Sequence, residues 1–137
     1  MVILSVDYGD MRTGVAVCDK MEILASPVGV VKGDYAPKVA EEIRKIAVDK
    51  KAELIVVGLP KNMDGTEGPR AELCRSFAEK LRQETGLPVN MWDERRTTVE
   101  AHNILSAHNY HGQKRKNTVD AVAASLILEG YLAFRGR

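Results

Sequence analysis

The chain has 137 residues, 45% of them hydrophobic and 28% charged, with a formal net charge of +1. This length suits one domain, residues 1–137, that buries its own core without disulfides or a structural metal, and the composition argues against a disordered chain. A nearly neutral net charge excludes a uniformly basic nucleic-acid-binding protein, so a site for a polyanion must come from local clusters of charge.

We expect no signal for secretion or membrane insertion in this sequence. Met1–Val6 has no basic residue and leads directly into Asp7, and no run of about 18 apolar residues is present. Cys18 and Cys74 lie far apart and match no zinc-binding spacing. We expect them to be buried thiols of a cytoplasmic protein that has no membrane partner.

The first part of the chain predicts three strands. Val2–Val6 is an apolar run rich in β-branched residues, and it ends in the turn signal Asp7-Tyr8-Gly9. Gly14–Cys18 and Ile23–Val31 are the next two predicted strands. Because the connections are short, we expect the three strands to form an antiparallel meander.

A helix, a strand and a second helix are predicted next. Asp34 is the expected N-cap of the first helix, with Pro37 in its first turn. Glu53–Gly58 is an apolar strand typical of the inside of a parallel sheet, and the loop Leu59–Pro69 leads to a helix that ends at Gly86. The residues expected on the inner faces of the two helices are Val39, Ile43, Ile46, Ala47, Leu73, Phe77 and Leu81.

The last part of the chain predicts one strand and two helices. Pro88–Trp92 is the fifth strand, Thr97 and Glu100 fit the capping box of a helix, and an apolar-faced helix follows the polar, basic segment Tyr110–Asn117. This order predicts an α/β fold with a mixed five-stranded sheet, three antiparallel strands and then two parallel ones, covered by helices on both faces. The inward residues are expected to be Ala101, Ile104 and Leu105 in one helix and Val119, Val122, Ala123, Leu126 and Ile127 in the other.

Acidic residues stand at the carboxyl ends of two predicted strands, where α/β sheets bind their ligands. Asp7 ends the first strand, and its burial would be costly unless a metal ion or the turn at Gly9 compensates the charge. Asp93 and Glu94 end the fifth strand, and alternation directs them to opposite faces of the sheet. We favour Glu94 as the residue that faces Asp7, with Asp93 holding an arginine or a backbone amide.

A third carboxylate, Asp120, lies near the start of the last predicted helix. Alone, it would be an ordinary partner of the helix dipole in the first turn. Together with Asp7 and Glu94, it would supply the oxygens that two Mg²⁺ or Mn²⁺ ions about 4 Å apart need for in-line cleavage of a phosphodiester.

The run Lys114-Arg115-Lys116 comes just before Asp120. Three consecutive basic residues are most often a solvated charge run, but beside a metal site they would clamp phosphates. Gly9 would let a phosphate backbone approach the carboxylate of Asp7. The other basic residues that could extend the clamp are Arg12, Lys61, Arg70, Arg95 and Arg96.

Four blocks of this sequence resemble the YqgF family. Together they span nearly the whole chain, and they are specific only in combination. The blocks are Asp7-Tyr8-Gly9 with Arg12, Gly14 and Ala16; Val57–Thr66 with Gly68-Pro69-Arg70; Trp92–Arg95 with Thr97-Thr98; and Lys114–Lys116 through Asp120 to Gly130-Tyr131.

The family is known as Holliday-junction-resolvase-like and as a nuclease of the 16S rRNA precursor. The resemblance implies a ribonuclease-H-like fold similar to RuvC, cytoplasmic maturation of the 5′ end of 16S rRNA, and a Mg²⁺ or Mn²⁺ cofactor. It implies that Asp7, Glu94 and Asp120 are the catalytic, metal-binding residues. The residues expected to bind the substrate are Gly9, Arg12, Lys61, Asn62, Arg70, Arg95, Lys114 and Arg115.

Two positions depart from what the resemblance implies. Met11 stands where the family often has a basic residue, which removes one expected phosphate contact. Ala123 stands where RuvC resolvases carry a further acidic residue. This second departure favours an RNA precursor over a four-way DNA junction as the substrate.

Three alternatives to an rRNA nuclease follow from the same residues. A Holliday-junction resolvase would be a two-fold dimer, whereas we expect a monomer or a weak homodimer. A nucleotide-binding module of the actin and sugar-kinase type would need a second domain. A non-catalytic RNA-binding factor would keep the fold without cleaving. The expected partners are therefore a nucleic acid and, for the rRNA function, ribosome-assembly factors.

Overall fold

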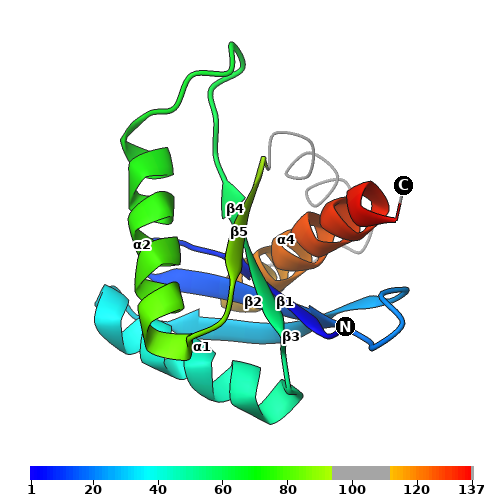
Figure 1. The fold of residues 1–137 in the computed structure, drawn as a ribbon. Helices are drawn as coiled ribbons and strands as arrows, with labels where there is room; N and C mark the ends of the chain where they lie inside the picture. Colours follow the sequence, from blue (N-terminus) through cyan, green and yellow to red (C-terminus); the bar gives the residue numbers. More distant parts are fainter. Residues whose placement is uncertain (94–111, 137) are drawn as a thin grey trace.

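The fold is described by a computed structural model that covers residues 1–93 and 112–136, with the backbone alone for residues 112–120. Strands come first in the chain, and helices then alternate with strands (Figure 1). The elements are β1 (Ile3–Asp7), β2 (Arg12–Cys18), β3 (Ala25–Lys32), α1 (Ala36–Lys50), β4 (Leu54–Leu59), α2 (Pro69–Thr85), β5 (Val89–Asp93) and α4 (Gly112–Arg135).

The five strands form one mixed sheet in the order β3-β2-β1-β4-β5. The pairs β1–β2 and β2–β3 are antiparallel, whereas β1–β4 and β4–β5 are parallel. This arrangement confirms the predicted sheet. It also brings the carboxyl ends of β1, β4 and β5 to the same edge.

Helices cover both faces of the sheet, α1 and α2 on one side and α4 on the other (Figure 1). Alternation along β1 divides its side chains between the two layers. Leu4 and Val6 pack into the core with α1 and α2, while Ile3 packs into the core with Ala124 and Ile127 of α4. Each face is therefore sealed by its own apolar cluster.

Several predicted positions were wrong in detail. Asp34 does not cap α1, because the N-cap is Tyr35 and no side chain bonds the end of the helix. Ile23 lies in the turn before β3 rather than in the strand, and it is 77% exposed. Leu73 is 50% exposed, because α2 turns smaller residues and Phe77 toward the sheet. The buried residues of α2 are Ala71, Cys74, Phe77, Ala78 and Leu81.

The last helix begins earlier than predicted, at Gly112 rather than near Val119. The basic run Lys114-Arg115-Lys116 therefore lies within α4 and not in a preceding loop. The predicted capping box at Thr97 and Glu100, with the inward residues Ala101, Ile104 and Leu105, lies outside the described residues.

Cys18 and Cys74 are both buried free thiols, as predicted. The pKa of the Cys18 thiol is raised, and burial is the largest cause of this shift. Across the described residues, none of the helices has the length and apolar character needed to cross a lipid bilayer.

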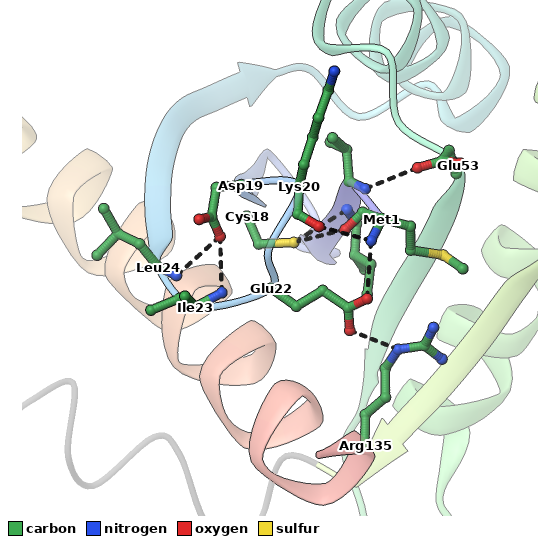
Figure 2. Close-up of polar contacts among 11 residues, drawn as sticks. Met1, Cys18, Asp19, Lys20, Glu22, Ile23, Leu24, Glu53 and Arg135 are labelled. Carbon is green, nitrogen blue, oxygen red and sulfur yellow. Dashed lines mark hydrogen bonds and ion pairs between the residues drawn. The ribbon is translucent and has the colours of Figure 1, made fainter.

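Glu22 ties the two ends of the described chain together (Figure 2). Its carboxylate accepts a hydrogen bond from the N-terminal ammonium of Met1 at 2.9 Å and another from Nε of Arg135 at 2.7 Å. The carboxyl end of α4 therefore lies beside the start of β1. Ser5, which is farther along the chain than Met1, contacts Ala124, which comes earlier in α4 than Arg135. The helix therefore runs antiparallel to the strand.

Candidate active site

Asp7 is the last residue of the central strand β1, and its side chain is half-buried. Alternation places Asp7 on the same face as Ile3 and Ser5. The hydroxyl of Ser5 donates a hydrogen bond of 2.6 Å to the carbonyl of Ala124, which shows that this face is the one covered by α4. Asp7 thus lies at the carboxyl edge of the sheet on the α4 side.

Two glycines flank Asp7 on the neighbouring strands. Gly14 of β2 is its antiparallel partner, and Gly58 of β4 follows directly after Val57, which pairs with Val6. Because glycine has no side chain, neither neighbour covers the carboxylate from the side. The arrangement suits a carboxylate that binds a cation or lies against a phosphate oxygen.

Asp120 lies in the third turn of α4, eight residues after Gly112. The prediction that it belongs to the first turn was wrong, and the helix dipole, whose effect falls off within one turn, does not account for a carboxylate here. Asp120 precedes Ala124 by about one helical turn, or about 6 Å. Asp7 follows Ser5 by two strand residues, or about 6.6 Å. Since helix and strand run antiparallel, the two backbones reach about the same level.

Asp93 lies on the opposite face of the sheet from Asp7. It pairs with Leu59, which belongs to the core beneath α1 and α2. Its neighbour Trp92 points to the α4 side, where its ring meets that of Tyr131 edge-on with the centroids 6.0 Å apart. Asp93 is therefore a poor candidate to share an ion with Asp7.

Glu94, Arg95 and Arg96 lie outside the described residues. Lys114 and Arg115 lie within the backbone-only part of α4, five to six residues before Asp120. No group of three or more His, Cys, Asp or Glu side chains that could hold a metal occurs among residues 1–93 and 121–136. Of the three predicted ligands, the structure thus describes the side chain of Asp7 and the backbone position of Asp120.

The turn after Asp7 is tightly packed around Gly9. A Cβ atom at this position would lie 2.1 Å from the carbonyl oxygen of Arg12. Such a contact is impossible without moving the backbone, so the turn requires glycine for its own packing. The approach of a phosphate to Gly9 stays a prediction.

Arg70, at the start of α2, contacts the same turn from outside. Its Nη1 atom lies 2.5 Å from Oδ1 of Asp10, and its Nη2 atom donates a hydrogen bond to the carbonyl of Tyr8. The guanidinium also lies 5.3 Å from the centroid of the Tyr8 ring. The contacts that the structure gives Arg70 are therefore to protein groups next to Asp7.

Arg12 and Lys32 lie side by side beyond Gly14. They pair across β2 and β3, and alternation from Gly14 puts Arg12 on the face of Asp7. Lys32 was not among the residues predicted from the sequence, because only the strand register brings it to this edge. Arg12 thus lies two residues along β2 from the partner of Asp7, whereas Lys32, on the edge strand, also lines the groove between β3 and α1.

The loop that follows β4 projects from the same edge of the sheet (Figure 1). Asn62 and Thr66 bridge it by a backbone hydrogen bond of 2.8 Å and a side-chain hydrogen bond of 2.9 Å. Glu67, at its base, makes two hydrogen bonds of 2.7 and 2.8 Å with Arg75 of α2, and these lower the pKa of the Glu67 carboxyl. Lys61 and Asn62 are thus presented by a braced loop.

An open groove of about 700 Å³ lies elsewhere, between β3 and α1. It is lined by Val31, Tyr35 and Val39 among others, on the side of the sheet covered by α1. Asp7 faces the other side. We therefore place the candidate active site at the carboxyl edge of β1 and not in this groove.

The chain is similar to known proteins along its whole length. A family model described as RuvX, Holliday junction resolvase, matches residues 1–134. A protein of Halothermothrix orenii named "Putative pre-16S rRNA nuclease" is 44% identical over 138 residues, covering 100% of this chain and 98% of that protein. A protein of Carboxydothermus hydrogenoformans with the same name is 41% identical over 137 residues, with coverages of 100% and 99%.

The fold is similar to that of RuvC. The structure of Thermus thermophilus RuvC in complex with a Holliday junction substrate superposes with a TM-score of 0.64 and 15% sequence identity. The match covers 99% of this chain and 96% of that chain. The ribonuclease-H-like architecture that the sequence implied is therefore confirmed.

Proposed function

Because the chain belongs to the RuvX (YqgF) family, whose model matches residues 1–134, we propose that it is a divalent-metal-dependent nuclease that processes the 5′ end of the 16S rRNA precursor. The names of its relatives point to this substrate. The structural observation that supports it best is the half-buried carboxylate of Asp7 between two glycines at the carboxyl edge of the sheet.

We assign Asp7, Glu94 and Asp120 as the ligands of Mg²⁺ or Mn²⁺. The donor set fits these ions, since carboxylate oxygens are the ligands that such hard cations prefer. The backbones of Asp7 and Asp120 lie at about the same height on one side of the sheet, which supports the assignment. Asp93 faces the other side of the sheet, which favours its neighbour Glu94 as the third ligand. When bound, the metal would supply Lewis-acid stabilisation of the charge that develops on the phosphate.

The residues around Asp7 would orient the substrate. Arg12 lies two residues along β2 from the partner of Asp7, Lys32 pairs with Arg12 on the edge strand, and Lys61 lies at the base of the projecting loop. Positive side chains on both flanks would hold a phosphate backbone across Asp7, with Lys114 and Arg115 of α4 adding to them.

Resolution of a four-way DNA junction is the second candidate function. The description of the family model and the RuvC-like fold favour it. Against it stands Ala123, which replaces an acidic residue expected in RuvC resolvases. Both candidates use the same carboxylates, so the choice between them rests on the substrate.

The test compares cleavage of a labelled 16S precursor 5′ leader with cleavage of a four-way DNA junction, both with Mn²⁺ or Mg²⁺. We expect the wild type to cut the RNA and Asp7→Asn to lose at least about 100-fold in rate, since even partners of metal ligands cost about 10–100-fold. Asp49→Asn, an exposed carboxylate at the end of α1, should cut like the wild type.

Paired symmetric nicks in the junction, with intact RNA, would replace the rRNA function by the resolvase function. An active Asp7→Asn variant would contradict the metal-ligand assignment. Failure of the wild type to cut either substrate would favour a non-catalytic RNA-binding factor.

A further inference from the structure

Arg70 makes three contacts with the turn that follows Asp7 and connects β1 to β2. Its two terminal nitrogens bond different oxygens, Oδ1 of Asp10 and the carbonyl of Tyr8. Its guanidinium lies over the ring of Tyr8, in the range of a cation–π contact. The planar fork of arginine suits this two-point grip, which the single ammonium of lysine cannot reproduce.

Tyr8 connects this grip to the core. Its ring stacks on Phe77 of α2, with the centroids 4.0 Å apart and the planes 10° apart, and Phe77 is only 1% exposed. Burial is the main influence on the Tyr8 hydroxyl and raises its pKa, while the nearby charge of Arg70 opposes the increase. Tyr8 is thus held between Phe77 below and Arg70 beside it.

The grip acts directly on the position of Asp7. Tyr8 is the next residue in the chain, and its carbonyl is the group that Arg70 binds. On its other side, Asp7 is held by pairing with Gly14. Fixing the carbonyl of Tyr8 therefore fixes the backbone that carries the Asp7 carboxylate.

We propose that Arg70 is a positioning residue, which holds Asp7 in the geometry needed for a divalent metal instead of contacting a phosphate of the substrate. The inference rests on the proposed function and deepens it. The side chain of Arg70 is 35% exposed, and both of its terminal nitrogens already have oxygen partners in the protein. These two bonds use two of the five N–H donors of the guanidinium, and both of them hold the turn beside Asp7.

Arg70→Lys separates the two roles, because it keeps the charge and loses the fork. We expect amide hydrogen exchange in residues 8–11 of the metal-free protein to become faster. We also expect the affinity for Mn²⁺, measured by calorimetry without substrate, to fall about 10-fold or more.

Arg82→Lys is the matched control. Arg82 lies near the other end of α2, and it also bonds a carboxylate and a carbonyl, Glu79 at 2.8 Å and Val89 at 2.7 Å. Val89 begins β5, at the opposite edge of the sheet from Asp7, and Glu79 lies within α2 itself. We expect this variant to lose a similar amount of thermal stability and to bind Mn²⁺ like the wild type.

Two results would overturn the role of Arg70. One is unchanged exchange in residues 8–11, and the other is a wild-type affinity for Mn²⁺ in Arg70→Lys. If the wild type and Arg70→Lys bind Mn²⁺ with the same affinity, only the role of Arg70 is refuted. A wild type that binds no Mn²⁺ would refute the proposed function as well.

Discussion

Gly9 shows how closely the residues around Asp7 constrain one another. An alanine there would place its Cβ 2.1 Å from the carbonyl oxygen of Arg12, which is backbone and cannot rotate away. We expect Gly9→Ala to lower the free energy of unfolding by about 1–3 kcal/mol, the usual cost of forcing an extra methyl group into a packed site. Urea denaturation measures this change.

Gly68→Ala is the comparison for that prediction. Gly68 is the N-cap of α2, and an added Cβ would meet no atom within 4 Å. This variant should cost less than Gly9→Ala. Equal losses would mean that the contact with Arg12 does not limit position 9.

The first two turns of α4 are the element that we expect to hold the substrate backbone. Changing Lys114 and Arg115 together to Ala should weaken RNA binding for all sequences alike. It should also reduce the slope of log affinity against log salt by about 1.4, since each contact with a single strand contributes about 0.7. A binding titration at several salt concentrations gives the slope.

The matched pair for this prediction is Lys45→Ala with Lys50→Ala on α1. Both lysines are exposed, and both lie in a helix on the other side of the sheet. Their removal changes the net charge by the same amount and should leave the slope unchanged. An equal fall of the slope in both pairs would show that net charge, and not the position on α4, sets the affinity.

The sheet could be predicted because each strand is marked by its own composition. The apolar, β-branched runs at β1 and β4 are strands in almost any context, and their short connections fix the antiparallel part. Helix details depend on neighbours instead. Leu73 is apolar and at helical spacing, yet α2 turns Ala71 and Cys74 inward, because small residues let it pack close to the sheet.

The candidate site was only partly predictable for a related reason. Asp7 could be identified locally, because it ends a buried apolar run. Lys32 reaches the same edge through strand register, and the contacts of Arg70 depend on how α2 meets the turn at Tyr8. Neither relation leaves a pattern along the sequence. The start of α4 at Gly112 was missed because its first turns are polar and show no apolar period.

At the scale of the whole molecule, α4 links the two ends of the sheet. Its early turns carry Asp120 at the edge where Asp7 lies, and its last turn reaches Glu22 at the opposite edge. About 22 Å of helix separates Asp120 from Arg135. The contacts at Glu22 thus help to set the direction of the helix that brings Asp120 to the site (Figure 2).

These contacts make part of the stability dependent on pH. The hydrogen bond from the N-terminal ammonium and then the one from Arg135 lower the pKa of Glu22 below its ordinary value of 4.5. A carboxyl with a lowered pKa in the folded state stabilises the fold above the unfolded-state pKa, and this contribution is lost as the pH falls through the folded-state pKa. We expect Glu22→Gln to lower Tm at pH 7 and the difference from the wild type to shrink between pH 4.5 and pH 2.5. Calorimetric scans of both proteins across this range, at one salt concentration, give that difference free of the other carboxyls, which titrate in both. A difference in Tm that stays constant down to pH 2.5 would mean that the side chain of Glu22 stabilises the fold by packing and not by its charge. The contacts between the two ends of the chain would then not depend on pH.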